Sequence, residues 1–275
     1  LMPSLDVVIP VKNRCLSSCV DSLRQLGDRL QTILICDGAS THPETVVTLS
    51  RLAAVKGIKI LRQPLPGFNK ATLLNYGIAQ SQADIILLSD ADILWNGAAV
   101  DALLTTLAST PQAVCHIADV RETARTTMAL TRRRYRYTIT KSERVYQVTL
   151  QEAQATLPQR PGCGLICAHR QTLLKLGGYK ECFYGWGWED QDLLMRARLM
   201  DLPVLAVGQV VHQSHAEALR NQFHDGLAPT TTRDQNIITC LAALQKGQIW
   251  GSLAPQPRLP EQRPQIQVHW PPHCR

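Results

Sequence analysis

Residues 85–92 read IILLSDAD and set four apolar residues directly before two carboxylates, Asp90 and Asp92. A continuous apolar run of this length predicts a strand buried on both faces, as in a parallel sheet covered by helices. Ligands of such sheets bind beyond the carboxyl ends of the strands. The stretch therefore predicts an α/β fold and places both carboxylates at the ligand-binding edge of its sheet.

The chain up to residue 118 repeats this unit, alternating short apolar runs with amphipathic stretches. We expect further strands over residues 6–11, 32–36, 58–61 and 113–118, and helices over residues 16–26, 45–55, 70–79 and 97–107. Such alternation implies crossover connections, and hence a mainly parallel central sheet flanked by helices on both faces, with a Rossmann-like first half. Asp37 follows the second strand and so lies at the same edge as Asp90 and Asp92.

The alternation stops between residues 121 and 159, where we expect a helical or irregular insertion. Its bases at residues 132–136 (RRRYR) fit either a solvated basic face or contact with an anionic acceptor or a membrane surface. Strands are expected again over residues 162–168 and 204–207, and helices over residues 171–176, after Asp190, and over residues 235–244. The proline-rich residues 254–275 predict an extended tail, little packed unless it docks on the domain.

Composition narrows the class of protein. The 275 residues, 45% hydrophobic and 19% charged, suit one large α/β domain or two small ones. A net charge of +7 favours an anionic partner, but the aromatic residues are not interleaved with the bases, so nucleic acid is the weaker option. No apolar run approaches the ~18 residues needed to span a bilayer, and the first four residues do not resemble a secretory signal. Nine scattered cysteines fit reduced thiols in a cytoplasmic protein better than disulfides.

Residues 185–193 (GWGWEDQDL) bring two tryptophans, two glycines and three acids together. Tryptophan faces can stack on a sugar ring, and the glycines allow the loop to close over it. The carboxylates stand at the start of an apolar-periodic run and so near a helix N-terminus. Ordinary enrichment of acids in a first helical turn explains the acids alone, but not the acids together with both tryptophans. The segment therefore favours the wall of a polar-ligand pocket.

Two basic clusters favour anion binding. Lys12 and Arg14 follow the first strand directly, at the mouth of the predicted sheet, where two cations can bind phosphate. Asn69 and Lys70 open a predicted helix after a Pro-Gly pair, which suits an anion at a helix N-terminus. Taken alone, the first cluster is explained better by exposed bases in a loop, and the second is explained equally well by a turn with its helix cap.

Asp90 and Asp92 can present oxygen to a hard cation, and Mg²⁺ or Mn²⁺ with diphosphate oxygens would suit them. His212 and His215 follow a short apolar strand downstream. A lone histidine is more often a surface or structural residue. Two of them downstream of a D-x-D pair favour a metal site.

These elements, in this order, resemble GT-A-fold glycosyltransferases, and most closely the family 2 enzymes and the β-1,4-galactosyltransferase and chondroitin-polymerase group. The resemblance covers about residues 5–215. It rests on residues 6–10 (DVVIP) with Lys12 and Arg14, residues 68–77 (FNKATLLNYG), Asp90-Ala91-Asp92, residues 185–190 (GWGWED) and His212. It implies one GT-A domain over residues 1–253, made of a nucleotide-sugar-binding half (1–119), a basic insertion (120–160) and an acceptor and catalytic half (161–253), followed by the tail (254–275).

The resemblance also implies an inverting, metal-dependent hexosyltransferase that moves a sugar from a UDP-sugar to a hydroxyl of a glycan-type acceptor. Asp190 would be the general base, Glu189 would orient the site, and Asp92 with His212 would hold Mn²⁺ or Mg²⁺, with His215 competing for that role. The implied donor contacts are Pro10, Lys12, Arg14, Asp37, Asn69, Lys70, Asp90, Ala91 and Asp92. The implied acceptor contacts are Trp186, Gly187, Trp188 and Asp190.

The sequence departs from the group at two positions. Gln191 stands where the galactosyltransferases typically carry another acid that holds the acceptor sugar, and Trp188 replaces a usual small residue. Without a stem, a membrane anchor or a clear disulfide pattern, the chain fits a cytoplasmic bacterial enzyme of polysaccharide biosynthesis better than a Golgi enzyme. Three alternatives stay open. One is a sugar-nucleotide-binding protein without transfer activity. Another is a sugar-nucleotide nucleotidyltransferase, although residues 7–14 lack the glycine-rich phosphate loop usual in that class. The third is a nucleic-acid-binding module, which only residues 132–136 support.

Overall fold

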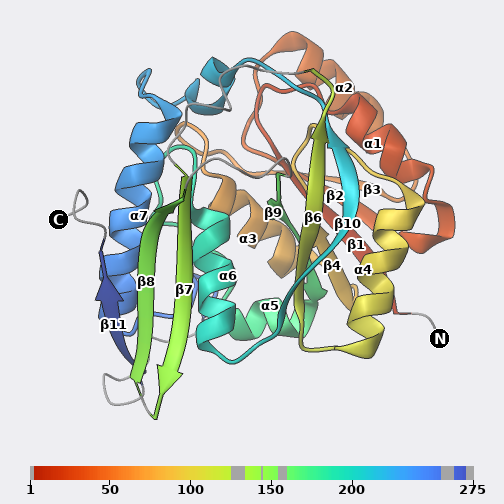
Figure 1. The fold of residues 1–275 in the computed structure, drawn as a ribbon. Helices are drawn as coiled ribbons and strands as arrows, with labels where there is room; N and C mark the ends of the chain where they lie inside the picture. The colour runs from red at the N-terminus through yellow and green to blue at the C-terminus, as the bar shows by residue number, and fades with distance from the viewer. Residues whose placement is uncertain (1–2, 125–133, 144, 154–159, 255–262, 271–275) are drawn as a thin grey trace.

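A computed structural model of the chain describes residues 3–124, 134–143, 145–153, 160–254 and 263–270 (Figure 1). Its centre is an eight-stranded sheet in the order β3-β2-β1-β4-β9-β6-β10-β5. The strands of this sheet are β1 (Leu5–Val11), β2 (Thr32–Asp37), β3 (Ile58–Arg62), β4 (Ile85–Leu88), β5 (Ile93–Leu94), β6 (Val114–Glu122), β9 (Gly162–His169) and β10 (Val204–His212). Strands β3, β2, β1 and β4 are parallel, as predicted. Strand β9 runs antiparallel between β4 and β6, so the sheet as a whole is mixed.

Helices cover both faces of this sheet (Figure 1). They are α1 (Ser17–Arg24), α2 (Pro43–Ala53), α3 (Lys70–Gln80), α4 (Gly97–Ser109), α5 (Arg170–Leu176), α6 (Glu189–Leu199) and α7 (Pro229–Gln245), with the short 3-10 helices η1 (Gly27–Arg29) and η3 (Glu217–Asn221). In β1, Val7 and Ile9 join the core beneath α1 and α4, whereas Val8 joins the core beneath α3, α5 and α6. Because successive side chains of a strand point to opposite faces, two apolar cores require the continuous apolar runs from which the strands were predicted.

The helical or irregular insertion expected between residues 121 and 159 is a wrong prediction for the described part. Strands β7 (Arg134–Ser142) and β8 (Val145–Ala153) form an antiparallel pair, and β11 (Gln265–His269) adds to β8 in parallel, making a second, three-stranded sheet. Alternate residues of β8, namely Tyr146, Val148 and Leu150, are buried against α6 and α7. The sequence of β8 does alternate apolar and polar residues, as a strand buried on one face requires, but the charged residues around it obscured this pattern. Arg132 and Arg133 lie outside the described residues.

The proline-rich tail docks on the domain through β11, where Ile266 is buried in the same core. Helix α7 begins at Pro229, six residues before the predicted start, with proline in its first turn, where the missing N–H costs nothing. Among the described residues, no helix combines the length and the apolar character needed to cross a bilayer.

A candidate active site at the carboxyl ends of the strands

A cavity of about 370 Å³ opens beyond the carboxyl ends of β1 and β4, where the apolar strands end and charged residues follow. It is bounded by the start of α6, by β9, and by the segment that contains η3. The predicted site residues that line it are Pro10, Lys12, Arg14, Lys70, Asp90, Ala91, Asp92, Trp186, Gly187, Trp188, Glu189, Asp190 and His212. The fold therefore brings most of the predicted donor residues, and all of the predicted acceptor and metal residues, into one cavity.

Asp37 and Asn69 do not line this cavity. Asp37 is buried, accepts a hydrogen bond from the backbone N–H of Ser40 at 2.9 Å and pairs with Arg62 at 3.4 Å. Asn69 caps α3, accepting from the Thr72 N–H at 3.0 Å and donating to the Glu181 carbonyl at 3.0 Å. Both side chains hold loops at the edge of the sheet, and their contact with a donor stays a prediction.

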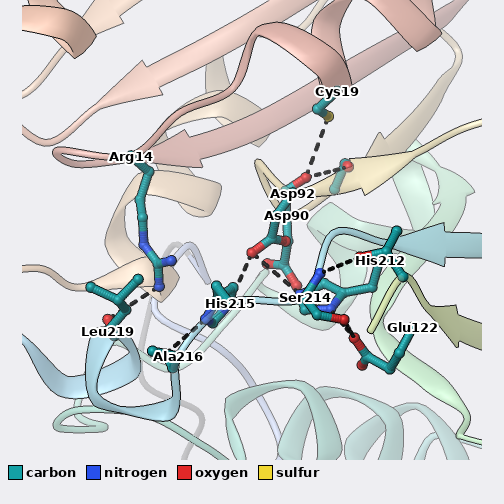
Figure 2. Close-up of polar contacts among 12 residues, drawn as sticks. Arg14, Cys19, Asp90, Asp92, Glu122, His212, Ser214, His215, Ala216 and Leu219 are labelled. Atoms are coloured by element: carbon teal, nitrogen blue, oxygen red, sulfur yellow. Dashed lines mark hydrogen bonds and ion pairs between the residues drawn. The ribbon is translucent and has the colours of Figure 1, made fainter. Parts of the chain in front are cut away.

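Asp92, His212 and His215 converge at one side of the cavity (Figure 2). The Nε2 atoms of His212 and His215 lie 3.3 Å and 3.1 Å from Asp92 Oδ2. Sheet register explains this meeting, because β5 follows Asp92 directly and pairs antiparallel with the end of β10, where His212 stands opposite Ile93. The sequence left His212 and His215 as competitors, and the structure places both at Asp92.

Glu122 orients this cluster, and the sequence analysis missed it. It ends β6 beside His212 in the parallel register, and its Oε2 accepts from His212 Nδ1 at 2.6 Å and from the Ser214 hydroxyl at 2.7 Å. His215 Nδ1 likewise bonds the carbonyl of Ala216 at 3.0 Å. With both Nδ1 atoms engaged in this way, both Nε2 atoms face Asp92, as in sites where an outer carboxylate or carbonyl fixes a metal-ligating histidine.

The three side chains fit a divalent metal ion. Their ligand atoms all lie within 4.8 Å of one another. Asp92 Oδ1 is buried and makes no hydrogen bond to the described residues. Burial opposes the charge on Asp92, but hydrogen bonds from both histidines outweigh burial and hold the pKa of its carboxyl well below its usual range. Two imidazole nitrogens suit a transition-metal ion such as Mn²⁺ better than Mg²⁺, which takes oxygen ligands.

Lys70 links the two walls of the cavity. It is the first residue of α3, and its Nζ lies 2.9 Å from Asp90, 3.4 Å from Asp190 and 3.9 Å from Glu189. Burial opposes the positive charge of Lys70, but the three carboxylates outweigh it and raise the pKa of the amine well above its ordinary value. One ammonium group therefore joins the Asp90 side of the cavity to the start of α6.

Glu189 and Asp190 open α6 with their carboxylates directed into the cavity. Burial, followed by repulsion from Asp190, raises the pKa of Glu189 to about 7. Burial also raises the pKa of Asp190 against the opposing charge of Lys70. Asp190 Oδ1 and Glu189 Oε2 are buried without a hydrogen-bond partner among the described residues. A polar group entering the cavity would find two acceptors there, both on carboxyl groups of raised pKa.

Gly164 makes room for Asp190. A Cβ at this position of β9 would lie 2.6 Å from Asp190 Oδ2 and 3.3 Å from Lys70 Nζ. Such an approach is closer than real Cβ atoms show. The absence of a side chain at residue 164 is therefore what allows the carboxylate to reach its position.

Besides Arg233, three arginines line the cavity, and of these only Arg14 was predicted. Arg14 donates to the carbonyl of Leu219 at 3.1 Å, and the guanidinium of Arg220 lies 4.7 Å from the ring centroid of Trp186. Arg160 pairs with Glu122. Burial lowers the pKa of all three guanidinium groups. Partly desolvated cations of this kind favour an anionic ligand such as a diphosphate. Arg160 and Arg220 each stand alone in segments without a clear sequence pattern, so the sequence did not mark them as site residues.

The two tryptophans differ in their surroundings. Trp188 precedes α6 in a left-handed conformation, with φ of 77°, and is buried with its ring edge-on to Tyr135 at 6.4 Å between centroids. Trp186 is only partly buried, and its backbone is held by Asn221 and Thr232. Trp186 is therefore the less buried of the two tryptophans that line the cavity, and the Arg220 guanidinium lies over its ring.

Solved structures share this fold. The chain is similar to the mannosyltransferase PcManGT from Pyrobaculum calidifontis in complex with GDP-Man and Mn²⁺ (17% identity, TM-score 0.55, covering 89% of this chain and 64% of that one). It is similar to GalNAc-T7 with UDP, GalNAc and Mn²⁺ (13%, 0.62, 90% and 50%). It is also similar to glucosyl-3-phosphoglycerate synthase from Mycobacterium tuberculosis with Mn²⁺, UDP and phosphoglyceric acid (18%, 0.54, 87% and 78%). The architecture is thus that of the GT-A glycosyltransferases, although the chain spans only about two thirds and one half of the first two proteins.

Sequence comparison gives the family. The family model described as "Glycosyl transferase family 2" matches residues 6–162, which is more than half of the chain. A second, described as "N-terminal domain of galactosyltransferase", matches residues 146–216. The search of curated proteins gave no match. The chain belongs to glycosyl transferase family 2, as the resemblance of its motifs predicted.

Proposed function

We propose that this glycosyltransferase moves a sugar from a UDP-sugar to a hydroxyl of a glycan-type acceptor, with inversion at the anomeric carbon. The observation that carries the proposal is the single cavity in which Lys70 joins Asp90 to Asp190, with the Asp92 cluster on one side and the opening of α6 on the other. Two of the similar structures contain GDP-Man or UDP, so GDP-sugars are the donors to test against UDP-sugars.

The donor side of the proposal rests on charge. Asp92 and His212, together with His215, would hold Mn²⁺, and a bound divalent cation would stabilise negative charge on the departing diphosphate. Arg14 and Arg220 lie in the same cavity, partly desolvated, where fixed positive charge stabilises a developing anion most strongly. Lys70 adds a third charge between the donor and acceptor sides.

The acceptor side rests on Asp190. Its raised pKa and unpartnered Oδ1 suit a general base that takes the proton of the acceptor hydroxyl as that oxygen attacks the anomeric carbon. Attack from the face opposite the leaving UDP gives inversion. Glu189 holds its carboxylate 3.9 Å from Lys70 and helps to position that ammonium, and Trp186 offers a ring face to the sugar.

A panel of UDP- and GDP-sugars with MnCl₂, scored by release of the nucleoside diphosphate, tests the proposal. We expect release from a UDP-sugar, its loss in excess EDTA, and a product of inverted anomeric configuration by NMR. Nucleotide binding without release would identify a binding protein, full activity in EDTA would remove the metal, and retained configuration would remove the proposed role of Asp190.

The eight cysteines among the described residues are free thiols. Free thiols support the proposal that the protein works in the reducing cytoplasm.

A further inference from the structure

A second cavity, of about 840 Å³, lies between strand β7 and helix α6, which run beside one another (Figure 1). Its volume falls in the upper part of the range for ligand pockets, about 300–1,000 Å³. Catalysis at the first cavity uses none of the side chains that β7 contributes here. The β7–β8 pair therefore builds a surface that the proposed reaction alone does not explain.

The second cavity adjoins the active site on its acceptor side. Cys163 of β9 and Gln191 of α6 line both cavities. Gln191 directly follows Asp190, the proposed base. Tyr135, in the second cavity, packs edge-on against Trp188, in the first, and lies 5.0 Å from the guanidinium of Arg233, also in the first. A ligand bound at the start of α6 can thus continue from one cavity into the other.

Tyrosines give the second cavity the surface of a saccharide site. Tyr135, Tyr137 and Tyr146 line it. Aromatic rings pack against the apolar faces of sugars, and phenolic hydroxyls bond their edges. Thr138 and Gln191 add polar groups. The mixture suits a hydroxyl-rich chain better than an apolar ligand.

The charge of the cavity lining is positive. Asp201 is the one acid among its lining residues, and it is engaged by Lys141 at 2.8 Å and by the Tyr146 hydroxyl at 3.2 Å. The lining also includes two exposed arginines, Arg136 of β7 and Arg198 of α6, and Arg198 hydrogen-bonds Tyr137. Arginine binds carboxylate, phosphate and sulfate groups through paired hydrogen bonds.

We propose that the second cavity binds the acceptor as a chain longer than one sugar, and that it selects saccharide chains bearing acidic groups. The inference rests on the proposed glycosyl transfer, since it places the reacting end of that chain beside Asp190. Arg136 and Arg198 would hold acidic groups, and the tyrosines would hold sugar rings further along the chain.

An array of defined neutral and acidic oligosaccharides, one to six sugars long, tests this with the full chain. We expect retention of acidic chains of several sugars and weakening of that retention as NaCl is raised. The Arg136→Ala/Arg198→Ala double variant should lose about tenfold to a hundredfold in affinity, the range for a lost hydrogen bond to a charged group. Arg51→Ala, on the exposed face of α2, is the matched control and should bind as wild type does.

The inference is overturned if the protein retains only neutral chains or single sugars, or if it retains no saccharide at all. It is also overturned if the double variant binds acidic chains as well as the wild-type protein does. Both replaced arginines are exposed, and an unchanged thermal unfolding midpoint would show that the variant is folded. Release of UDP by the wild-type protein is scored separately. Release of UDP without acidic-chain binding sinks this inference alone, whereas acidic-chain binding without release of UDP sinks the proposed transfer alone.

Discussion

Gly164→Ala should slow sugar transfer while leaving the fold and nucleotide binding in place. The new Cβ would lie 2.6 Å from Asp190 Oδ2, and real Cβ contacts begin near 3.0 Å, so the carboxylate must retreat by at least 0.4 Å. The neighbouring atoms are the ends of flexible side chains, so the backbone need not move. Because a misplacement of about 1 Å at a reacting group can cost 10²-fold, we expect kcat to fall roughly tenfold to a hundredfold.

The assay is release of UDP at saturating donor and acceptor, together with the dissociation constant of UDP and the thermal unfolding midpoint. Gly97→Ala is the matched control, because a Cβ there meets nothing closer than 3.8 Å, and all three quantities should stay at their wild-type values. A wild-type kcat in Gly164→Ala would refute the position assigned to Asp190. A large fall of the unfolding midpoint would refute the claim that the side chains can adjust.

Three further perturbations test the metal site, a buried ion pair and the effect of pH. Glu122→Gln should weaken Mn²⁺ binding by roughly 10–100-fold, because outer partners of ligating histidines commonly contribute that much; calorimetric titration with MnCl₂ measures it, and an unchanged affinity would separate Glu122 from the site. Arg196→Ala should lower the free energy of unfolding by about 3–5 kcal/mol in urea titrations, because it removes the guanidinium that lies 2.6 Å from the fully buried Asp192 carboxylate. A loss under about 1 kcal/mol would show that Lys180, which lies 3.2 Å from the same carboxylate, is a sufficient partner. Burial raises the pKa of Glu189 from 4.5 to about 7, so between these pH values the folded protein keeps a proton that the unfolded chain has lost, and stability falls as pH rises. Glu189→Gln should remove this slope, at most about 1.36 kcal/mol per pH unit, and an identical slope in the variant would exclude Glu189 as its source.

Sequence predicted those features that depend on local pattern. The apolar run before Asp90 predicted β4, and the acids after the glycine–tryptophan segment predicted the start of α6, because strand burial and helix entry leave period and composition behind. The resemblance of the motifs to a known family then predicted that these segments lie together in one site. Pro229 shows the limit of local pattern, because α7 begins there with a polar first turn (PTTT) that carries no apolar period.

Features that depend on register could not be predicted. Glu122 meets His212 because β6 and β10 pair in parallel in one register, across a separation of 90 residues. Nothing near Glu122 in the sequence marks it as a partner of a histidine. The β7–β8 pair was missed for another reason, because the bases around Arg134 dominated the interpretation while the alternation in β8 is the weaker signal.

Asp190→Asn, measured for both sugar transfer and UDP binding, tests the proposed mechanism most directly. The variant keeps the size of the side chain and removes the base, and Asp21→Asn on the exposed face of α1 is the control. Because a general base contributes typically ~10²–10⁴-fold, we expect kcat to fall by that factor while the dissociation constant of UDP stays within about twofold. Turnover at the wild-type rate in Asp190→Asn would contradict the mechanism.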